Sequence, residues 1–381
     1  MFLGEATAPS SSNHDIRMNT KPTHSVPTSL FGLPGEDPHE LILFGSDSDG
    51  GLRSIVAIHN TSRGPAFGGC RMWRYASDLA ALTDALRLSQ GMTFKNALAD
   101  LPFGGGKAVI IAPEGASIDR SQLFHAFGDL VNSAGGRYIT AEDVGTTTAD
   151  MRMVASRSKF VSGLPRQGKF GGDPSPKTAW GVFLAIEQGL RLHLKKSLKG
   201  STVAVQGLGS VGLALCEYLS DSGAQLIVAD VDELRVAKAI GRFGARRVSP
   251  EEILEVSADV LAPCALGGVL NSTSVPKIRA SIVAGAANNQ LSRPEDGVML
   301  RDRGVLYLPD FLINAGGIVS VAREYLGTGS ESEVMSEVAL IAGRVAELLE
   351  RCQSGGSPAE VAETWARQKI GLGSSWSREV P

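Results

Sequence analysis

Neither an excess of charge of one sign nor a long apolar run is present in this sequence. Its 37 Lys and Arg nearly balance 40 Asp and Glu, and the net charge is −3. Such a balance gives no electrostatic footprint for nucleic acid or for an anionic membrane. No apolar run reaches the roughly 18 residues that span a bilayer, and the N-terminus lacks the charged and apolar regions of a signal peptide. We therefore expect a soluble cytoplasmic protein whose partner is a small molecule.

Cysteine pairs and histidine clusters are missing as well. The four cysteines are far apart and include no C-x-x-C pair, so we expect reduced, structural thiols. Of the six histidines, only His59, His125 and His193 lie outside the N-terminal region, and none has a partner at metal-ligand spacing. The sequence therefore predicts no metal site. The cysteines are Cys70, Cys216, Cys264 and Cys352.

The length of 381 residues exceeds what one hydrophobic core usually organises, which predicts two α/β domains. Residues 1–30 carry Ser, Thr, Pro and Asn without apolar periodicity, and we expect a disordered tail there. Residues 31–170, joined by C-terminal helices within 345–381, are predicted to form a mixed α/β domain. Residues 171–344 are predicted to form a doubly wound parallel sheet with flanking helices.

Apolar spacing marks the elements of the first domain. Residues 41–44 and 55–58 are predicted as the strands of a hairpin, because a turn-rich segment separates them. A cap at 77–78 begins a helix that is predicted to run to Met92, with Lys95 just beyond its end. The further elements predicted here are a buried strand at 109–111 and a helix at 121–131.

The second domain is predicted from alternating strands and helices that begin with a βαβ unit. A Gly- and Pro-rich connection between the domains is expected at 168–176. The predicted strands are 202–206, 226–229, 260–262 and 282–284, and the predicted helices are 178–192, 211–219, a long one from 331 and one near 358–369.

A glycine-rich turn after the first strand of the second domain carries the G-x-G-x-x-G pattern. Gly207 permits the tight turn, Gly209 lets a pyrophosphate approach the backbone, and Gly212 lets helix pack on strand. Asp230 ends the next strand, where a carboxylate can accept hydrogen bonds from an adenosine ribose and repel a 2′-phosphate. The pattern favours NAD over NADP, although Arg235 lies nearby, and a simple αβ loop with a surface Asp is the alternative.

Two lysines, Lys95 and Lys107, flank a segment that ends in three glycines, which indicate backbone brought close to a ligand. A Walker A loop requires glycine where Leu101 stands and a hydroxyl residue where Ala108 stands, so it is excluded. In a cleft, one lysine can hold a substrate carboxylate, while its charge and desolvation lower the pKa of the other, which then acts as a general base. Two solvated surface lysines remain an equally open alternative.

Asp143 and the pair Asn288 and Asn289 stand where strands are predicted to end. A carboxylate at such a position can shuttle protons, but a helix N-cap or a turn is the more common role of an Asp there. The asparagines mark the edge of a parallel sheet where ligands bind, and a structural turn explains them equally well.

Together these segments resemble the leucine, phenylalanine and valine dehydrogenases, a branch of the glutamate dehydrogenase superfamily, over about residues 41–350. The resemblance implies a domain for substrate binding and oligomerisation, a Rossmann domain for NAD, and a homo-oligomer. It is carried by GPAFGGCRMW (64–73), GMTFKNALADLPFGGGK (91–107), GRYITAEDVGT (136–146), VQGLGSVG (205–212), APCALGG (262–268), VAGAANNQL (283–291) and PDFLINAGG (309–317).

The resemblance also implies a role for each candidate residue. Lys95 would bind the substrate carboxylate, Lys107 would activate water and stabilise the carbinolamine, and Asp143 would exchange protons with the amino group and water. Asn288, and with it Asn289, would lie near the carboxylate and the nicotinamide. The cofactor would contact Thr178, Gly207, Gly209, Ser210, Val211, Gly212, Asp230, Ala286 and Asn288.

The substrate side chain is where this chain departs from its relatives. Glutamate enzymes of the superfamily carry lysine, and leucine enzymes leucine, at the position of Phe67. A phenyl ring leaves a γ-carboxylate unpaired and, if it points inward, makes the pocket shallower. We therefore predict oxidative deamination of a branched-chain L-amino acid, valine or leucine, with a phenylalanine dehydrogenase or a non-catalytic NAD-binding sensor as alternatives. The predicted pocket residues are Phe67, Gly68, Ala141, Ile318 and Val321.

Overall fold

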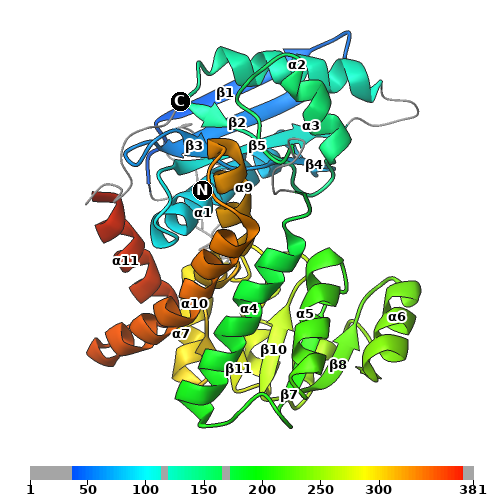
Figure 1. Cartoon of the computed structure of the whole chain (residues 1–381), viewed down its shortest axis with the longest axis vertical. Helices are drawn as coiled ribbons and strands as arrows, with labels where there is room; N and C mark the ends of the chain where they lie inside the picture. Colours follow the sequence, from blue (N-terminus) through cyan, green and yellow to red (C-terminus); the bar gives the residue numbers. More distant parts are fainter. Residues whose placement is uncertain (1–36, 113–118, 165–171, 372–381) are drawn as a thin grey trace, which may run out of the picture. The chain divides into compact units, whose positions relative to one another are not determined.

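The computed structural model describes residues 37–112, 119–164 and 172–371. The tail expected to be disordered, 1–30, and part of the connection expected at 168–176 lie outside these described residues. The described part contains two sheets, each with helices packed against it (Figure 1). None of its helices is both long and apolar enough to cross a membrane.

The first sheet is mixed and has the strand order β1-β2-β5-β3-β6, with β4 also pairing β5. The predicted hairpin is confirmed, because β1 and β2 pair antiparallel with Leu43 opposite Val56. The strand predicted at 109–111 is the buried end of β5. The strands are β1 (Leu41–Asp47), β2 (Leu52–Asn60), β3 (Ala66–Phe67), β4 (Cys70–Trp73), β5 (Gly104–Ile111) and β6 (Tyr138–Ile139).

Strand β5 begins with three glycines, which allow neighbouring segments of the chain to pack closely against it. A Cβ atom on Gly104 would lie 1.9 Å from a carbonyl oxygen of β2, and one on Gly105 would lie 2.1 Å from the backbone nitrogen of Thr93. A Cβ atom on Gly106 would lie 2.8 Å from the ring of Tyr138. None of the three lines the main pocket described below. The expectation that this cluster admits a ligand is therefore corrected: it admits neighbouring protein segments.

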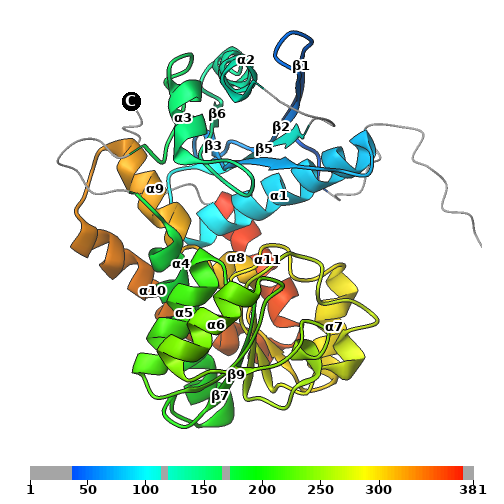
Figure 2. The same cartoon turned by 90° about the vertical axis from the view of Figure 1, so that its right-hand side faces the viewer.

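Helices cover both faces of the first sheet (Figure 2). Helix α1 (Asp78–Leu98) packs along β5 and β2, while α2 (Arg120–Ser133) and α3 (Thr148–Ala155) lie on the other side. The hydroxyl of Ser77 caps α1, as predicted, by accepting a hydrogen bond from the N–H of Ala80. The helix continues six residues past the predicted end, so Lys95 lies in its last turn and not beyond it. Tight packing of these added residues on the glycines of β5 accounts for the extension.

The second sheet is entirely parallel and has the order β12-β11-β10-β7-β8-β9. This is the predicted doubly wound arrangement, since the chain builds outward from β7 in one direction and then from β10 in the other. The ends of β7 and β10 form the switch point at which such sheets bind ligands. The strands are β7 (Thr202–Gln206), β8 (Gln225–Ala229), β9 (Arg246–Arg247), β10 (Val260–Pro263), β11 (Ile282–Val283) and β12 (Leu306–Tyr307).

Helices α4, α5 and α6 lie on one side of this sheet and α7 lies on the other (Figure 2). The helix predicted at 178–192 is present as α4 and a following π-helical turn, Leu190–Leu194. The helices are α4 (Ser175–Gly189), α5 (Ser210–Asp221), α6 (Glu233–Phe243), α7 (Pro294–Asp302), α8 (Asp310–Ile313), α9 (Gly316–Leu326), α10 (Glu331–Arg351) and α11 (Pro358–Gly371), with 3₁₀ turns at Ile253–Glu255, Val275–Lys277 and Cys352–Ser354.

The C-terminal helix α11 returns to helix α1. The Nζ of Lys369 lies 2.5 Å from the Oδ1 of Asp100, which follows α1, and Arg63 donates a hydrogen bond to the carbonyl oxygen of Lys369. The same helix also contacts α7 and α10. The assignment of 345–381 to the first domain, like the boundaries of that domain, stays a prediction.

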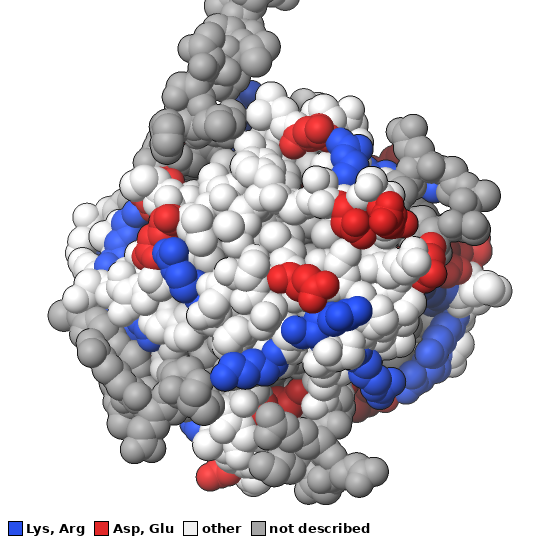
Figure 3. Space-filling model, turned by 90° about the horizontal axis from the view of Figure 1, so that it is seen from above, with Lys and Arg blue, Asp and Glu red and all other residues white. Residues whose placement is uncertain are grey.

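Charged side chains of both signs are interspersed on the face shown in Figure 3. Ion pairs also link separate elements: Arg53 of β2 contacts Asp78 of α1, and Lys196 lies 2.5 Å from Asp259. The mixed surface is what the balanced composition leads us to expect.

Candidate active site

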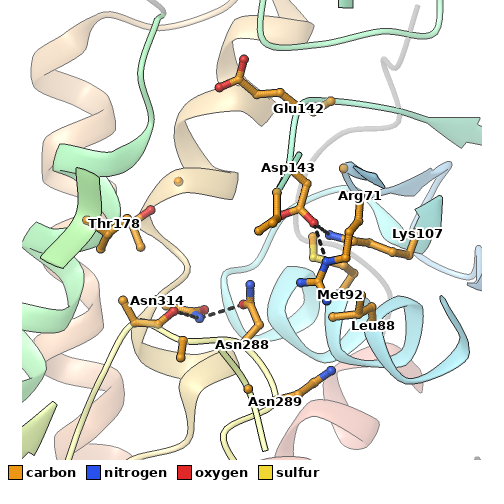
Figure 4. Close-up of a pocket in the computed structure, with 18 of the residues that line it drawn as sticks. Arg71, Leu88, Met92, Lys107, Glu142, Asp143, Thr178, Asn288, Asn289 and Asn314 are labelled. Atoms are coloured by element: carbon orange, nitrogen blue, oxygen red, sulfur yellow. Dashed lines mark hydrogen bonds and ion pairs between the residues drawn. The ribbon is translucent and has the colours of Figure 1, made fainter. Parts of the chain in front are cut away.

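A pocket of about 850 Å³ lies beside the N-terminus of α5 and the end of β10, and is also lined by α1, β4 and β5. Figure 4 shows Arg71 of β4 and Lys107 of β5 pointing toward Asp143 in this pocket. Most of the residues predicted from the sequence line it: Phe67, Lys95, Lys107, Ala141, Asp143, Thr178, Ser210, Val211, Ala286, Asn288, Asn289, Ile318 and Val321. The predicted residues that do not line it are Gly68, Gly207, Gly209, Gly212 and Asp230.

A buried ion pair joins Lys107 to Asp143 in this pocket. The Nζ of Lys107 lies 2.8 Å from the Oδ2 of Asp143. Burial raises the pKa of Asp143, but the charges of Lys107 and Arg71 outweigh burial and lower that pKa to about 2. The carboxylate is therefore ionised. Asp143 caps no helix, since the N-cap of α3 is Thr147, but it does begin a turn, in which the N–H of Thr146 donates to its carbonyl oxygen at 3.0 Å. Both Lys107 and Lys95 are buried, so the alternative of two solvated surface lysines falls away.

Lys95 reaches the other wall of the pocket from α1. Its Nζ donates a hydrogen bond to the Oδ1 of Asn288 at 2.9 Å. Burial lowers the pKa of Lys95 to about 8, with the charge of Asp310 opposing this and that of Lys107 adding to it. The sequence assigned a lowered pKa to the general-base lysine. In the structure, burial lowers the pKa of Lys95, the lysine expected to bind the carboxylate.

Asn314 is a pocket residue that sequence reasoning missed. Its Nδ2 donates to the same Asn288 oxygen at 2.9 Å, and it lines the pocket from the end of α8. Its own Oδ1 is buried without a hydrogen-bond partner among the described residues. Asn314 lies inside the motif at 309–317, but its spacing alone gave no reason to single it out.

The turn that presents Asn288 is held by a buried acid. Asn289 has a φ of 51°, a left-handed conformation uncommon outside glycine, and its N–H donates to the Oδ2 of Asp310 at 2.8 Å. The Oδ1 of Asp310 accepts from the hydroxyl of Tyr307 at 2.7 Å. Burial raises the pKa of Asp310. This support fixes Asn288 beside Lys95 and gives Asn289 a structural role.

The end of the pocket beyond the Lys107 pair is apolar. Phe67 is fully buried, and its ring meets those of Phe103 and Tyr325 at centroid distances of 4.9 and 5.9 Å. Gly68, expected at this wall, does not line it. A Cβ atom there would lie 1.8 Å from the carbonyl oxygen of Gly106, so Gly68 serves close strand packing. The predicted apolar residues that do line this region are Phe67, Ala141, Ile318 and Val321.

The glycine turn after β7 has the geometry that a dinucleotide requires. Gly207 has a φ of 93°, and a Cβ atom on Gly212 would lie 2.0 Å from the carbonyl oxygen of Gly207. Gly209 is the N-cap of α5 and makes no side-chain cap, so the first N–H groups of the helix stay open to an anion. Two of these glycines thus shape the turn without touching the pocket, which Ser210 and Val211 line instead.

Asp230 lies at the end of β8 and braces this turn. Its Oδ2 accepts from the N–H of Leu208 at 2.5 Å, and its Oδ1 accepts from the N–H of Asp232 at 2.8 Å. Arg235, nearby, is paired with Asp232 at 3.2 Å. A carboxylate at this position fits a ribose better than a 2′-phosphate, and its contact with the ribose stays a prediction.

Histidine and cysteine show no metal-binding arrangement. In the ranges that the structure describes, no group of three His, Cys, Asp or Glu side chains is placed to hold a metal ion. All four cysteines are free. The ring centroid of His59 lies 4.9 Å from that of His39, and these two rings belong to no such group. Residues 37–40, just before β1, thus contact β2, which spacing along the chain does not reveal.

Both halves of the chain match models of known protein families. Residues 42–160 match the family model "Glu/Leu/Phe/Val dehydrogenase, dimerisation domain", and residues 173–234 and 228–339 match "Glutamate/Leucine/Phenylalanine/Valine dehydrogenase". The chain is 43% identical to leucine dehydrogenase of Geobacillus stearothermophilus, over 90% of this chain and 93% of that one. It is 41% identical to phenylalanine dehydrogenase of Bacillus thermotolerans, over 93% and 94%.

A solved structure agrees with these matches. The crystal structure of L-tryptophan dehydrogenase from Nostoc punctiforme superposes with a TM-score of 0.72 at 41% identity, covering 88% of this chain and 96% of that one. The similarity therefore covers nearly the whole length of both chains.

A doubly wound sheet with a dinucleotide turn, beside a pocket that holds a buried lysine–carboxylate pair, defines a dehydrogenase of amino acids. The matches are specific enough to go further. The chain belongs to the Glu/Leu/Phe/Val dehydrogenase family. It is an oxidoreductase whose cofactor is NAD, as predicted from the sequence.

Proposed function

We propose that this enzyme oxidatively deaminates branched-chain L-amino acids, with valine and leucine as its substrates. The amino acid, NAD⁺ and water give the 2-oxo acid, ammonium, NADH and a proton, and the reaction is reversible. One observation carries the proposal: the Lys107–Asp143 pair shares its pocket with an apolar wall formed by Phe67 and its neighbours. The relative named leucine dehydrogenase is consistent with such a substrate.

The two lysines divide the binding and the chemistry. Lys95 binds the substrate carboxylate and gives up its hydrogen bond to Asn288 when it does so. This places the α-amino group toward Asp143, which accepts a proton from it. NAD, which Thr178, Ser210 and Val211 would hold, would supply the acceptor for the hydride of the Cα atom. Lys107 then activates a water molecule for attack on the resulting imine and stabilises the carbinolamine, and Asp143 returns a proton to the departing amine.

The cofactor is proposed to lie along the turn after β7. Ser210 and Val211 present helix N–H groups to the pyrophosphate, and Asp230 is aimed at the ribose by its bonds to the turn. Thr178 and Ala286 line the pocket and are proposed to contact the nicotinamide.

Specificity is proposed to rest on the shape and polarity of the apolar wall. No charged side chain stands at Phe67, Ala141, Ile318 or Val321, so the γ-carboxylate of glutamate would be buried unpaired. The ring of Phe67 is held by Phe103 and limits the depth available to the substrate. Relatives named phenylalanine and tryptophan dehydrogenase make an aromatic substrate the second candidate.

We further propose a cytoplasmic homo-oligomer that assembles through the first domain, within about residues 31–170. The match of residues 42–160 to a model described as a dimerisation domain supports this assembly. Four free thiols fit a reducing compartment.

The proposal is tested with a panel of L-amino acids, supplied with NAD or NADP at alkaline pH, by following the reduced cofactor. The highest kcat/KM is expected for valine or leucine with NAD. A clear preference for phenylalanine or tryptophan would defeat the branched-chain assignment, and turnover of glutamate would defeat the account of the wall at Phe67.

A further inference from the structure

A second basic group reaches the Asp143 carboxylate, from a residue that sequence reasoning did not single out. Arg71, on β4, places its Nε 3.3 Å from the Oδ2 of Asp143. This is the oxygen that Lys107 contacts at 2.8 Å, and Figure 4 shows both side chains converging on it. The position and charge of Asp143 therefore depend on two partners and not on Lys107 alone.

Arg71 is itself held from its far side. Its Nη1 donates to the Oδ2 of Asp84, on α1, at 3.0 Å. The hydroxyl of Tyr75 donates to the same oxygen at 2.6 Å. Asp84 thereby occupies one arm of the guanidinium, so that Arg71 offers Asp143 a single N–H.

We propose that Arg71 is a positioning residue for deamination: braced by Asp84 and Tyr75, it holds the Asp143 carboxylate against Lys107 and keeps that carboxylate ionised between proton transfers. The proposal rests on the proposed function, since it concerns the proton acceptor of that reaction. It adds a residue that does not touch the substrate's reacting atoms but acts through Asp143.

Among the described residues, two basic groups contact Asp143 directly: Lys107 on β5 and Arg71 on β4. The other titratable groups that interact with it are Cys70 on β4, Tyr75 just after β4, Tyr138 on β6 and, further off, Lys95 on α1. Burial raises the pKa values of the Cys70 thiol and the Tyr138 hydroxyl well above their usual range, so both are neutral. The ionised state of Asp143 therefore depends mainly on Lys107 and Arg71.

Loss of the guanidinium leaves Lys107 alone to oppose the burial of Asp143. The pKa of Asp143 then rises, and a larger fraction of the carboxylate is protonated at the acidic end of the activity range. A protonated Asp143 cannot accept the proton of the substrate amino group. Substrate binding through Lys95 stays intact, because Lys95 lies on the other wall of the pocket.

The test compares pH profiles of kcat and kcat/KM for the wild type, Arg71→Met and Arg71→Lys. For Arg71→Met we expect kcat to fall about tenfold or more, the acidic limb to move to higher pH, and KM for the amino acid to change little. Arg71→Lys, which keeps a charge but not the fork, should recover part of the shift. Arg53→Met is the matched control: Arg53 also joins a strand of the first sheet to an Asp of α1, but it lies on the surface.

The outcomes separate this proposal from the proposed function. A wild type that oxidises none of the amino acids removes the proposed function itself. If the wild type is active, two results for Arg71→Met would overturn the positioning role. In the first, kcat falls but the pH profile is unchanged; in the second, KM rises and kcat does not fall. If Arg71→Met fails to fold, Tyr75→Phe is used in its place. Loss of the Tyr75 hydrogen bond leaves Asp84 to draw Arg71 away from Asp143, so the acidic limb of the pH profile should again move to higher pH. An unchanged profile in Tyr75→Phe also overturns the proposal.

Discussion

Lys95 on α1 donates a hydrogen bond to Asn288, at 2.9 Å, and thereby joins the first sheet's helix to the turn that follows β11. The Asn288 oxygen also accepts a hydrogen bond from Asn314. The hydrogen-bond partner of Lys95, the lysine expected to bind substrate, is therefore a neutral amide. A carboxylate offers the buried ammonium group a charged partner in place of this amide. Substrate binding is thus favoured because Lys95 exchanges the Asn288 amide for the substrate carboxylate within a preformed site.

Replacement of Lys95 by Met should stabilise the folded protein at neutral pH while it weakens substrate binding. The pKa of Lys95 is about 8 in the fold against 10.5 when unfolded, so below pH 8 both states are protonated and folding carries the full cost of burying the charge. We expect Lys95→Met to gain about 1–3 kcal/mol at pH 7. The gain should shrink as pH rises from 8 to 10.5.

Urea unfolding of wild type and Lys95→Met at pH 7 and pH 10 measures this difference. Lys196→Met, which removes an exposed lysine paired with Asp259, is the control and should change stability by less than about 1 kcal/mol. Equal stability of wild type and Lys95→Met at pH 7 would contradict the burial of an uncompensated charge.

Phe67→Leu should deepen the apolar end of the pocket. Because Phe67 lines the pocket and its ring is held by Phe103 and Tyr325, a smaller side chain leaves room for a longer substrate. We expect kcat/KM for leucine relative to valine to rise roughly tenfold. Phe124→Leu, which shortens a buried Phe in the other core of the first sheet, should leave that ratio unchanged. A ratio that does not move in Phe67→Leu would show that this ring does not set substrate length.

Two glycines of the cofactor turn should respond differently to alanine. At Gly212 the new Cβ meets the carbonyl oxygen of Gly207 at 2.0 Å, so Gly212→Ala should cost about 1–3 kcal/mol of stability and weaken NADH binding. At Gly209 the nearest atom is 4.0 Å away, on Arg235, so the fold should tolerate Gly209→Ala. NADH binding should still weaken roughly tenfold there, because the methyl group occupies the pyrophosphate path.

NADH fluorescence titration and thermal unfolding of both variants give the two readings. A Gly209→Ala variant that binds NADH as the wild type does would place the pyrophosphate elsewhere.

Much of the fold could be predicted because local signals and tertiary packing agree. The alternation of apolar strands with amphipathic helices predicted the second sheet, and Ser77 marked the start of α1. The end of α1 was placed too early, because the residues past Met92 are stabilised by packing on β5 and not by a local signal. Thr93 lies against Gly105, and Asn96 donates a hydrogen bond to the carbonyl oxygen of Gly104. The same packing explains why the glycine cluster was taken for a ligand site.

The site could be predicted only in part for a related reason. Lys107 and Asp143 stood out as motif residues, and the structure brings them together. Arg71 and Asn314 did not, since each gains its meaning from partners far away in the chain. The lowered pKa of Lys95 depends on how much water the fold removes, a quantity that residue spacing does not contain.

The central claim is that the Lys107–Asp143 pair performs amino-acid deamination. The most direct measurement is the rate of NADH formation from L-valine or L-leucine by the wild type and by Lys107→Ala, with NADH binding and thermal unfolding of both proteins as controls. The account predicts turnover by the wild type and a loss of roughly a thousandfold or more in the variant, with NADH binding retained. A Lys107→Ala enzyme that folds and keeps wild-type turnover would contradict it.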